Sequence, residues 1–197
     1  MLKLADLFGF LARSTAFLGG LVLLVLVALV CVSVTGRGLN TLAHSDAFSA
    51  FAPQLAAWIL ERGVGSVNGD FELLEAGIAV VIFAALPLCQ FVGGHATVDV
   101  FTRFLPPIVQ RYLKAFWEVV LAAVIVLIGM RLWEGLLSKM SNGQTTFILE
   151  FPVWWAYAVS FAACAIAMVV SVFCALVRVL DLFTGQRTLP VAEDAMH

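Results

Sequence analysis

The sequence predicts an all-α membrane protein with four transmembrane helices, and three observations carry that prediction. Hydrophobic residues make up 62% of the 197 residues and charged residues 12%, which is about half the charged share of a soluble domain. Four separate stretches are apolar over the roughly 20 residues that a helix needs to cross a bilayer. Short segments of alternating polarity, which a membrane barrel would need, are not evident. The composition therefore excludes a soluble fold.

The predicted spans are residues 14–34, 73–92, 116–136 and 151–177. Each should be a helix, because backbone polar groups inside a bilayer must be satisfied within their own segment. The first span is predicted to be retained, since its uncharged run is longer than that of a signal peptide. Residues 1–185 are thus predicted to form a single four-helix membrane domain, and residues 186–197 a polar, disordered tail.

The distribution of basic residues predicts the orientation of the spans. Basic residues are enriched in cytoplasmic loops of membrane proteins, and seven of the eleven lie on one predicted side, with four on the other. The side with seven holds both termini and the loop at 93–114. We therefore expect both termini in the cytoplasm, with the seven residues Lys3, Arg13, Arg103, Arg111, Lys114, Arg178 and Arg187.

The long loop after the first span contains a predicted short amphipathic helix at residues 53–62. Pro53 suits a first helical turn, and Leu55, Trp58 and Ile59 fall on one helical face. This helix is expected to lie on the outer membrane surface or to pack on a partner.

The inner loop is predicted to hold a second short amphipathic helix. Asp99 can cap it, because its carboxylate can accept hydrogen bonds from the exposed N–H groups of a helix start. Pro107 would then start the next helix. The basic side chains of Arg103, Arg111 and Lys114 are expected to face anionic lipid headgroups.

The sequence offers no constellation typical of an enzyme or of a cofactor or metal site. His44 and His95 fall on opposite predicted sides and His197 is terminal, so no pair could serve as the axial ligands of one haem. No nucleotide-binding or metal-hydrolase motif occurs. The four cysteines lie in apolar runs, where packing is their usual role. We therefore predict a non-enzymatic protein with no cofactor, no metal and no nucleic-acid partner.

The predicted spans carry almost no polar residue near the bilayer midplane. Transporters usually place polar or ionisable residues there, whereas Gln90 lies near the inner end of its span. This pattern favours a membrane protein that binds other proteins. Two alternatives stay open: a four-span redox or assembly anchor, and a small transporter that works alone as a homo-oligomer.

Several polar residues at span ends are candidates for contact with partners. Glu72 and Glu75 are three positions apart at the start of the second span, where acids also favour a helix N-terminus. His95 and Asp99 follow that span, and they suit either an ordinary interfacial position with a helix cap or a partner contact. Glu134 is predicted to form a local ion pair with Arg131.

An ordered set of motifs resembles one known family. Glu72 opens the second span, Gly94-His95-x-x-Val98-Asp99 closes it, and Leu105-Pro106-Pro107 follows. Gly143-Gln144-Thr145 then precedes the Pro152-x-Trp154-x-x-Tyr157 entry to the fourth span. In this order, over residues 70–177, the chain resembles the small membrane subunit of tripartite ATP-independent periplasmic (TRAP) transporters.

The resemblance implies a function and a set of partners. Such a small permease subunit scaffolds a separate large membrane subunit, which carries solute, and helps to dock a periplasmic solute-binding protein. The implied process is sodium-coupled uptake of an organic acid across the bacterial inner membrane. The implied partner-interface candidates are Glu72, Glu75, His95, Asp99, Arg103, Gln144, Pro152 and Trp154.

Overall fold

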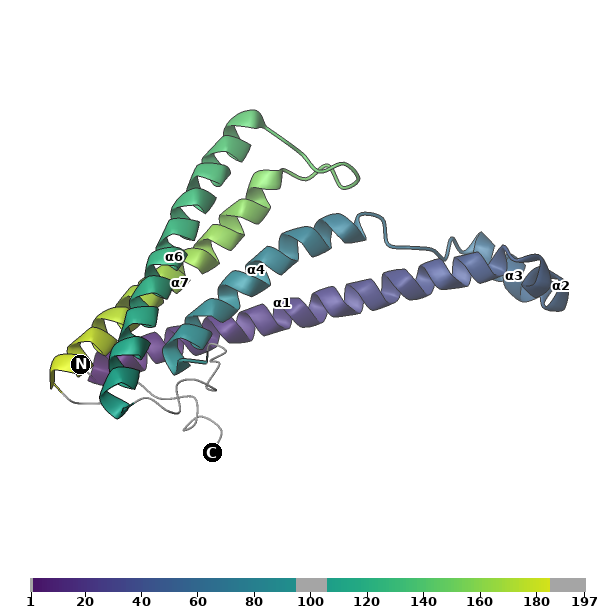
Figure 1. Ribbon diagram of the computed structural model, residues 1–197. Coiled ribbons are helices and arrows are strands. Elements are labelled where there is room, and N and C mark those ends of the chain that lie inside the picture. Colours follow the sequence, from purple (N-terminus) through teal and green to yellow (C-terminus); the bar gives the residue numbers. More distant parts are fainter. Residues whose placement is uncertain (1, 95–105, 185–197) are drawn as a thin grey trace.

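The computed structural model describes residues 2–94 and 106–184, and within these ranges the chain is helical with no strand (Figure 1). The described helices are α1 (Leu2–Ala43), α2 (Asp46–Phe51), α3 (Pro53–Glu61), α4 (Asp70–Val92), α6 (Pro107–Asn142) and α7 (Val153–Thr184). Four of them, α1, α4, α6 and α7, are long and apolar enough to cross a membrane. The predicted all-α fold with four membrane helices is confirmed.

Local sequence sets where these helices begin and end. Pro107 occupies the first turn of α6, as expected, because proline lacks the N–H that a first turn leaves unpaired. Gly93 and Gly143 end α4 and α6 in the left-handed conformation, which glycine adopts without steric cost. The four long helices continue past the predicted spans, and the 42 residues of α1 reach about 63 Å at 1.5 Å per residue.

α1 and α4 pack antiparallel along a seam that repeats every seven residues. Along α1 the buried positions of this seam include Ala12, Gly19, Leu26 and Ser33. Their partners on α4 are Phe91, Ala84, Gly77 and Asp70, respectively. A seven-residue spacing keeps one face of a helix turned to its neighbour over several turns. Small residues on this face let the two backbones approach closely, as in other membrane helix pairs.

The two helix pairs converge at one end and spread apart at the other. α6 packs on α7, and α4 packs on both α1 and α7, while Figure 1 shows the pairs diverging from the end that holds the N-terminus. We call that end, where α4 and α7 finish, the convergent end, and the opposite end the splayed end. A buried cluster at the convergent end joins three helices through Ala12, Phe91, Val170, Cys174 and Val177.

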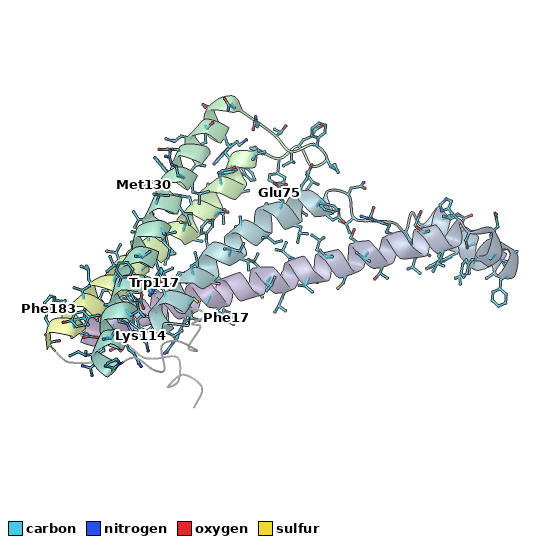
Figure 2. All side chains as sticks on the ribbon, viewed as in Figure 1. Phe17, Glu75, Lys114, Trp117, Met130 and Phe183 are labelled. Carbon is cyan, nitrogen blue, oxygen red and sulfur yellow. The ribbon has the colours of Figure 1, made fainter. Side chains whose placement is uncertain are left out.

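The outer faces of the long helices are covered with exposed apolar side chains. Phe17, Trp117, Met130 and Phe183, which are labelled in Figure 2, have 75%, 53%, 55% and 84% of their surface exposed. An apolar surface this extensive is unfavourable in water and is the expected one in lipid. The outside of the bundle therefore fits a bilayer environment.

The loop after α1 forms a short helical hairpin from α2 and α3. The predicted helix at residues 53–62 matches α3. The expected single face of Leu55, Trp58 and Ile59 is divided, however. Ile59 is buried against Ala43, whereas Leu55 and Trp58 are about half exposed. The predicted short helix that Asp99 would cap and the predicted tail at 186–197 lie outside the described residues.

Candidate functional site at the two ends of the bundle

At the splayed end, α4 starts with an acidic residue that is bonded to α1. The Ser33 hydroxyl donates to the Asp70 carboxylate at 2.5 Å, and the Arg37 guanidinium lies 3.5 Å from that carboxylate. Ser33 in turn accepts the Val67 N–H at 3.2 Å. The exposed N–H groups of a helix start also favour a negative charge there. Asp70 therefore fixes the first turn of α4 to α1 at the last position of their seam.

Glu72, in the first turn of α4, binds the loop that joins α6 to α7. Its carboxylate accepts the backbone N–H groups of Ile148 and Leu149 at 2.7 and 3.0 Å. These partners lie more than 70 residues away in the sequence. The α6–α7 loop (residues 143–152) extends from α6 and α7 towards the start of α4 in Figure 1. Glu72 thus connects the two helix pairs where they are farthest apart.

The α6–α7 loop is itself ordered by backbone hydrogen bonds. The Thr146 N–H donates to the Phe151 carbonyl at 2.9 Å, and the Val153 N–H donates to the Gln144 carbonyl at 3.0 Å. Leu149 packs directly on Gly69, where a side chain would collide with it. Phe147, at the loop tip, is 98% exposed. The loop therefore presents an apolar side chain outward while its backbone is held by Glu72.

At the convergent end, three helices meet around a buried polar cluster of Gln90, Glu118 and Arg178. The Gln90 side-chain amide of α4 donates a hydrogen bond to the Glu118 carboxylate of α6. The Arg178 Nε of α7 lies 3.7 Å from the other oxygen of that carboxylate. Gln90 is fully buried and Glu118 is 8% exposed. Charged groups inside a membrane protein are costly unless they are paired, so this arrangement holds the three helices in register.

The remaining predicted residues of the described chain are Glu75, Gln144, Pro152 and Trp154. Glu75 and Trp154 are exposed and half-buried, respectively. The Gln144 side chain accepts from Lys139 at 2.6 Å, and Pro152 pairs with Thr145 across the base of the α6–α7 loop.

Of the basic candidates for lipid contact, the structure describes Arg111 and Lys114. Arg111 and Lys114 are exposed on the first turns of α6, and Figure 2 shows Lys114 near the start of that helix. His95, Asp99 and Arg103 lie outside the described residues. The predicted ion pair between Arg131 and Glu134 is confirmed at 2.8 Å, with both side chains largely exposed.

The buried polar cluster was missed by reasoning from the sequence. Because Glu118 and Arg131 are 13 positions apart, or about 20 Å along a helix, the sequence predicts only that both charges lie near opposite membrane interfaces. It does not predict that α4 and α7 pair with Glu118. The available signal was the position of Gln90, Glu118 and Arg178 in the sequence. Gln90 and Arg178 lie near the C-terminal ends of α4 and α7, and Glu118 lies in the N-terminal third of the oppositely directed α6, so all three are near one end of the bundle. Polar residues at one depth on three neighbouring helices can satisfy each other.

The described residues contain no group of three or more His, Cys, Asp or Glu side chains that could hold a metal ion. The four cysteines are free thiols; Cys164 and Cys174 are fully buried and pack as small apolar residues, whereas Cys31 is exposed. The polar contacts of Asp70 and Glu118 join helices to one another, and those of Glu72 join α4 to the α6–α7 loop. Their evident chemical role is therefore to set the geometry of the bundle.

These features define a multi-pass helical membrane protein in which buried polar side chains join neighbouring helices. The model of the family described as "Tripartite ATP-independent periplasmic transporters, DctQ component" matches residues 51–182. The chain belongs to this family, and it is therefore a small component of a TRAP transporter. The matched region contains α3, α4, α6 and all but the last two residues of α7, and it leaves out α1. No curated protein and no solved structure matches the chain.

Proposed function

We propose that this chain is the non-catalytic small permease subunit that scaffolds the large, solute-carrying membrane subunit of its transporter. Membership of the DctQ family supports this role. The observation that carries it is the placement of polar side chains: the described interhelical polar contacts gather at the two ends of the bundle, around Asp70, Glu72 and Glu118. A solute path needs polar groups near the midplane, so solute movement is assigned to the partner subunit.

The splayed end is the proposed docking region for a periplasmic solute-binding protein. It carries the α6–α7 loop with exposed Phe147 and the half-buried Trp154. Gln144 and Pro152 belong to the same loop and remain candidates for this contact. Glu75 is also exposed there, whereas the Glu72 carboxylate already binds the loop backbone. Glu72 is therefore proposed to act on docking indirectly, through the position of the loop.

The transported solute and the coupling ion would be set by the partners. By analogy with the family, we propose sodium-coupled uptake of an organic acid at the bacterial inner membrane. Both termini are then placed in the cytoplasm, as the positive-inside rule predicts. The exposed Arg111 and Lys114 of α6 fit that side, where basic residues meet anionic headgroups.

Co-purification tests the scaffolding role. The chain should be expressed with an affinity tag together with the candidate large subunit of its transporter, and extracted in mild detergent. We expect a stable complex containing both polypeptides after size-exclusion chromatography. Recovery of this chain as a stable monomer that never carries the large subunit would refute the proposal.

We propose further that His95 and Asp99 of the inner loop contact the large subunit, and the variants His95→Ala and Asp99→Ala test this contact. Each variant is expected to reduce the yield of the complex more than the amount of chain inserted in the membrane. Lys114→Ala is the matched control, since Lys114 is exposed and is assigned to lipid. Unchanged yield and transport in both loop variants would leave His95 and Asp99 as ordinary loop residues.

A further inference from the structure

We propose that the α2–α3 hairpin is an amphipathic anchor that lies on the bilayer surface at the splayed end, with Leu55 and Trp58 inserted among the lipids. The inference concerns the membrane and does not depend on the identity of the transported solute or on the large subunit. It rests on how the hairpin is held, on the faces of α3, and on the continuity of its apolar surface with that of α1.

The hairpin is fixed to the end of α1 by a small core. Ala43 of α1 packs against Ala56 and Ile59 of α3, and the Asn40 side-chain amide donates to the Val64 carbonyl at 2.8 Å. The hydroxyl of Ser45 caps α2 by accepting the Phe48 N–H at 3.3 Å. Because both sides of the hairpin are tied to α1, the direction of its outward surface is set by α1.

Helical spacing divides α3 into three faces. Ala56 and Ile59 form the buried face, with 4% and 6% of their surface exposed. A second face carries Leu55 and Trp58, which are 51% and 50% exposed. The third face carries Gln54, Ala57 and Glu61, which are also exposed. Exposed apolar and polar faces on one short helix are typical of a helix that lies in a membrane interface.

The aromatic residues of the hairpin fit an interfacial position in detail. The Arg62 guanidinium carbon lies 4.8 Å from the centre of the Trp58 ring. A charged group and an apolar ring are therefore side by side at this end of α3. Tryptophan is enriched at membrane–water boundaries, where its ring can contact lipid while its polar atom stays hydrated. Phe51 at the end of α2 is 89% exposed. No charged residue occurs from Ala47 to Leu60. Contact of this surface with lipid therefore requires no charged side chain to lose its water.

The lipid-facing surface of α1 continues into the hairpin. Exposed apolar side chains along α1 include Leu24, Val32 and Leu42, and Figure 1 shows the hairpin at the far end of that helix. From Ser33 to Ala43, α1 advances about 15 Å, and this stretch still carries exposed apolar side chains at Val34, Leu39 and Leu42. The hairpin therefore comes within reach of the headgroup layer.

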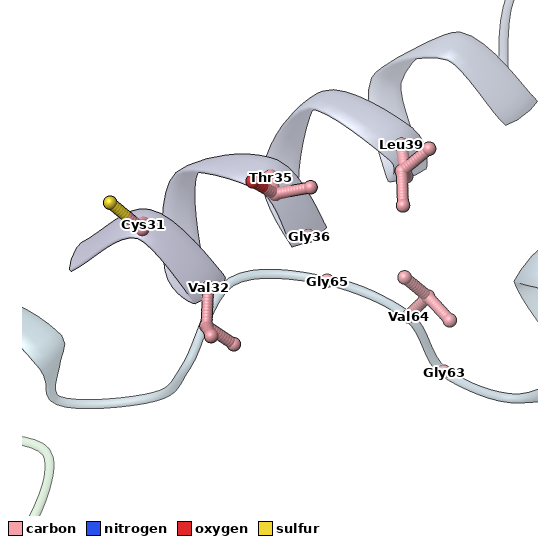
Figure 3. Close-up of a pocket in the computed structure, with 8 residues that line it drawn as sticks. All are labelled: Cys31, Val32, Thr35, Gly36, Leu39, Gly63, Val64 and Gly65. Carbon is pink, nitrogen blue, oxygen red and sulfur yellow. The ribbon is translucent and has the colours of Figure 1, made fainter. Parts of the chain in front are cut away.

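A groove between α1 and the segment that leaves α3 gives further apolar surface at the base of the hairpin. It has a volume of about 530 Å³ and is lined by α1 and by the segment that leaves α3, as Figure 3 shows. The segment passes so close to α1 that a side chain at Gly36 would collide with the Gly65 carbonyl. Val32, Leu39 and Val64 line the groove. An acyl chain is the occupant that an apolar groove beside a bilayer would meet first.

Spin labels on two faces of the hairpin test the proposal. The four native cysteines are replaced by alanine, and single cysteines are then introduced at Phe51 and Leu55 or, as matched controls, at Gln54 and Ala57. All four positions are exposed, so the labels should not disturb folding. The labelled chain, in complex with its membrane partner, is reconstituted into vesicles of phosphatidylcholine and phosphatidylglycerol. Collision rates with oxygen, which concentrates in lipid, and with a water-soluble nickel chelate are compared.

We expect labels at residues 51 and 55 to collide preferentially with oxygen, and labels at 54 and 57 with the nickel chelate. Equal preference for nickel at all four positions would overturn the proposal, because the hairpin would then project into water. Protection of residues 51 and 55 from both reagents would also overturn it, because that face would be covered by protein. Measurement without the membrane partner then checks that any oxygen preference belongs to this chain.

Discussion

The convergent and splayed ends of the bundle are held together by different kinds of contact. At the convergent end, side chains of three helices meet in a buried polar cluster around Glu118. At the splayed end, the tie between the helix pairs that the structure describes is the Glu72 carboxylate on two backbone N–H groups of an exposed loop. Breaking the first leaves a buried group without its counter-charge, whereas breaking the second releases a loop. The comparison indicates a rigid base and an adjustable opposite end.

Loss of Glu118 should have the largest effect on the bundle. Glu118→Ala removes the carboxylate that faces the Arg178 guanidinium and the Gln90 amide. Removing one member of a buried ion pair typically costs about 3–5 kcal/mol. We therefore expect a loss of this order in the unfolding free energy, measured by denaturant titration in mixed micelles.

Glu118→Gln gives the matched control for this prediction. It keeps a hydrogen-bond acceptor for Gln90 and loses only the negative charge, so its stability should fall between those of the wild type and Glu118→Ala. Wild-type stability of Glu118→Ala would mean that the cluster does not hold the convergent end together.

A substitution in the seam between α1 and α4 tests how far the rigid packing extends towards the splayed end. A Cβ at Gly19 would lie 2.8 Å from the Ala84 Cβ, closer than two carbons can approach. Gly19→Ala should therefore push α1 from α4 and destabilise the protein by about 1–3 kcal/mol, as overpacked cores usually do.

The neighbouring Gly20 is a control of the same chemistry, because a Cβ there would meet nothing within 4 Å. Gly20→Ala should be neutral or stabilising by up to about 1 kcal/mol, since alanine favours a helix. Equal stability of the Gly19→Ala and Gly20→Ala variants would show that the seam is loosely packed.

Glu72→Gln should change the splayed end with little effect on global stability. The neutral amide accepts more weakly than the carboxylate, so the Ile148 and Leu149 N–H groups should exchange with solvent several-fold faster. Hydrogen exchange with residue resolution measures this directly. Glu75→Gln, one turn along α4 and exposed, should leave the exchange of both residues unchanged. Unchanged hydrogen exchange of Ile148 and Leu149 in Glu72→Gln would show that the Glu72 carboxylate does not hold the loop.

The smallest effect is expected at the surface ion pair between Arg131 and Glu134. Both side chains are more than half exposed, at 76% and 63%. Exposed ion pairs typically contribute about 0.2–1 kcal/mol to stability. Arg131→Ala should therefore change the unfolding free energy by less than about 0.5 kcal/mol. If Arg131→Ala lowered the unfolding free energy as much as Glu118→Ala, buried and exposed ion pairs would contribute equally to stability, contrary to this comparison.

The sequence was sufficient to predict the number, type and order of the membrane helices. Runs of apolar residues report span length directly, and Pro53 and Pro107 marked two helix starts correctly. The splitting of the α3 face was not predicted, because helical periodicity cannot tell which neighbour covers Ile59. The seven-residue seam from Ala12 to Ser33 was visible in principle, but small residues give weak hydropathy signals.

The polar contacts were less predictable than the fold. Glu72 was identified as important from its place at a helix start, yet its bond to the α6–α7 loop depends on a loop conformation that composition does not encode. The Gln90–Glu118 hydrogen bond requires the relative depth and rotation of two helices. Both are tertiary facts, set by the packing of α4 against its neighbours. The contacts of the exposed Glu75 with partner proteins stay predictions.

Solute uptake into proteoliposomes is the most direct measurement of a scaffolding small component. Vesicles should be prepared with the complete transporter, with the transporter lacking this chain, and with this chain alone, and uptake followed with the ligand that stabilises the solute-binding protein. We predict uptake by the complete set, a severe loss without this chain, and none by this chain alone. Solute flux through vesicles that contain only this chain, or full uptake in its absence, would contradict the scaffolding role.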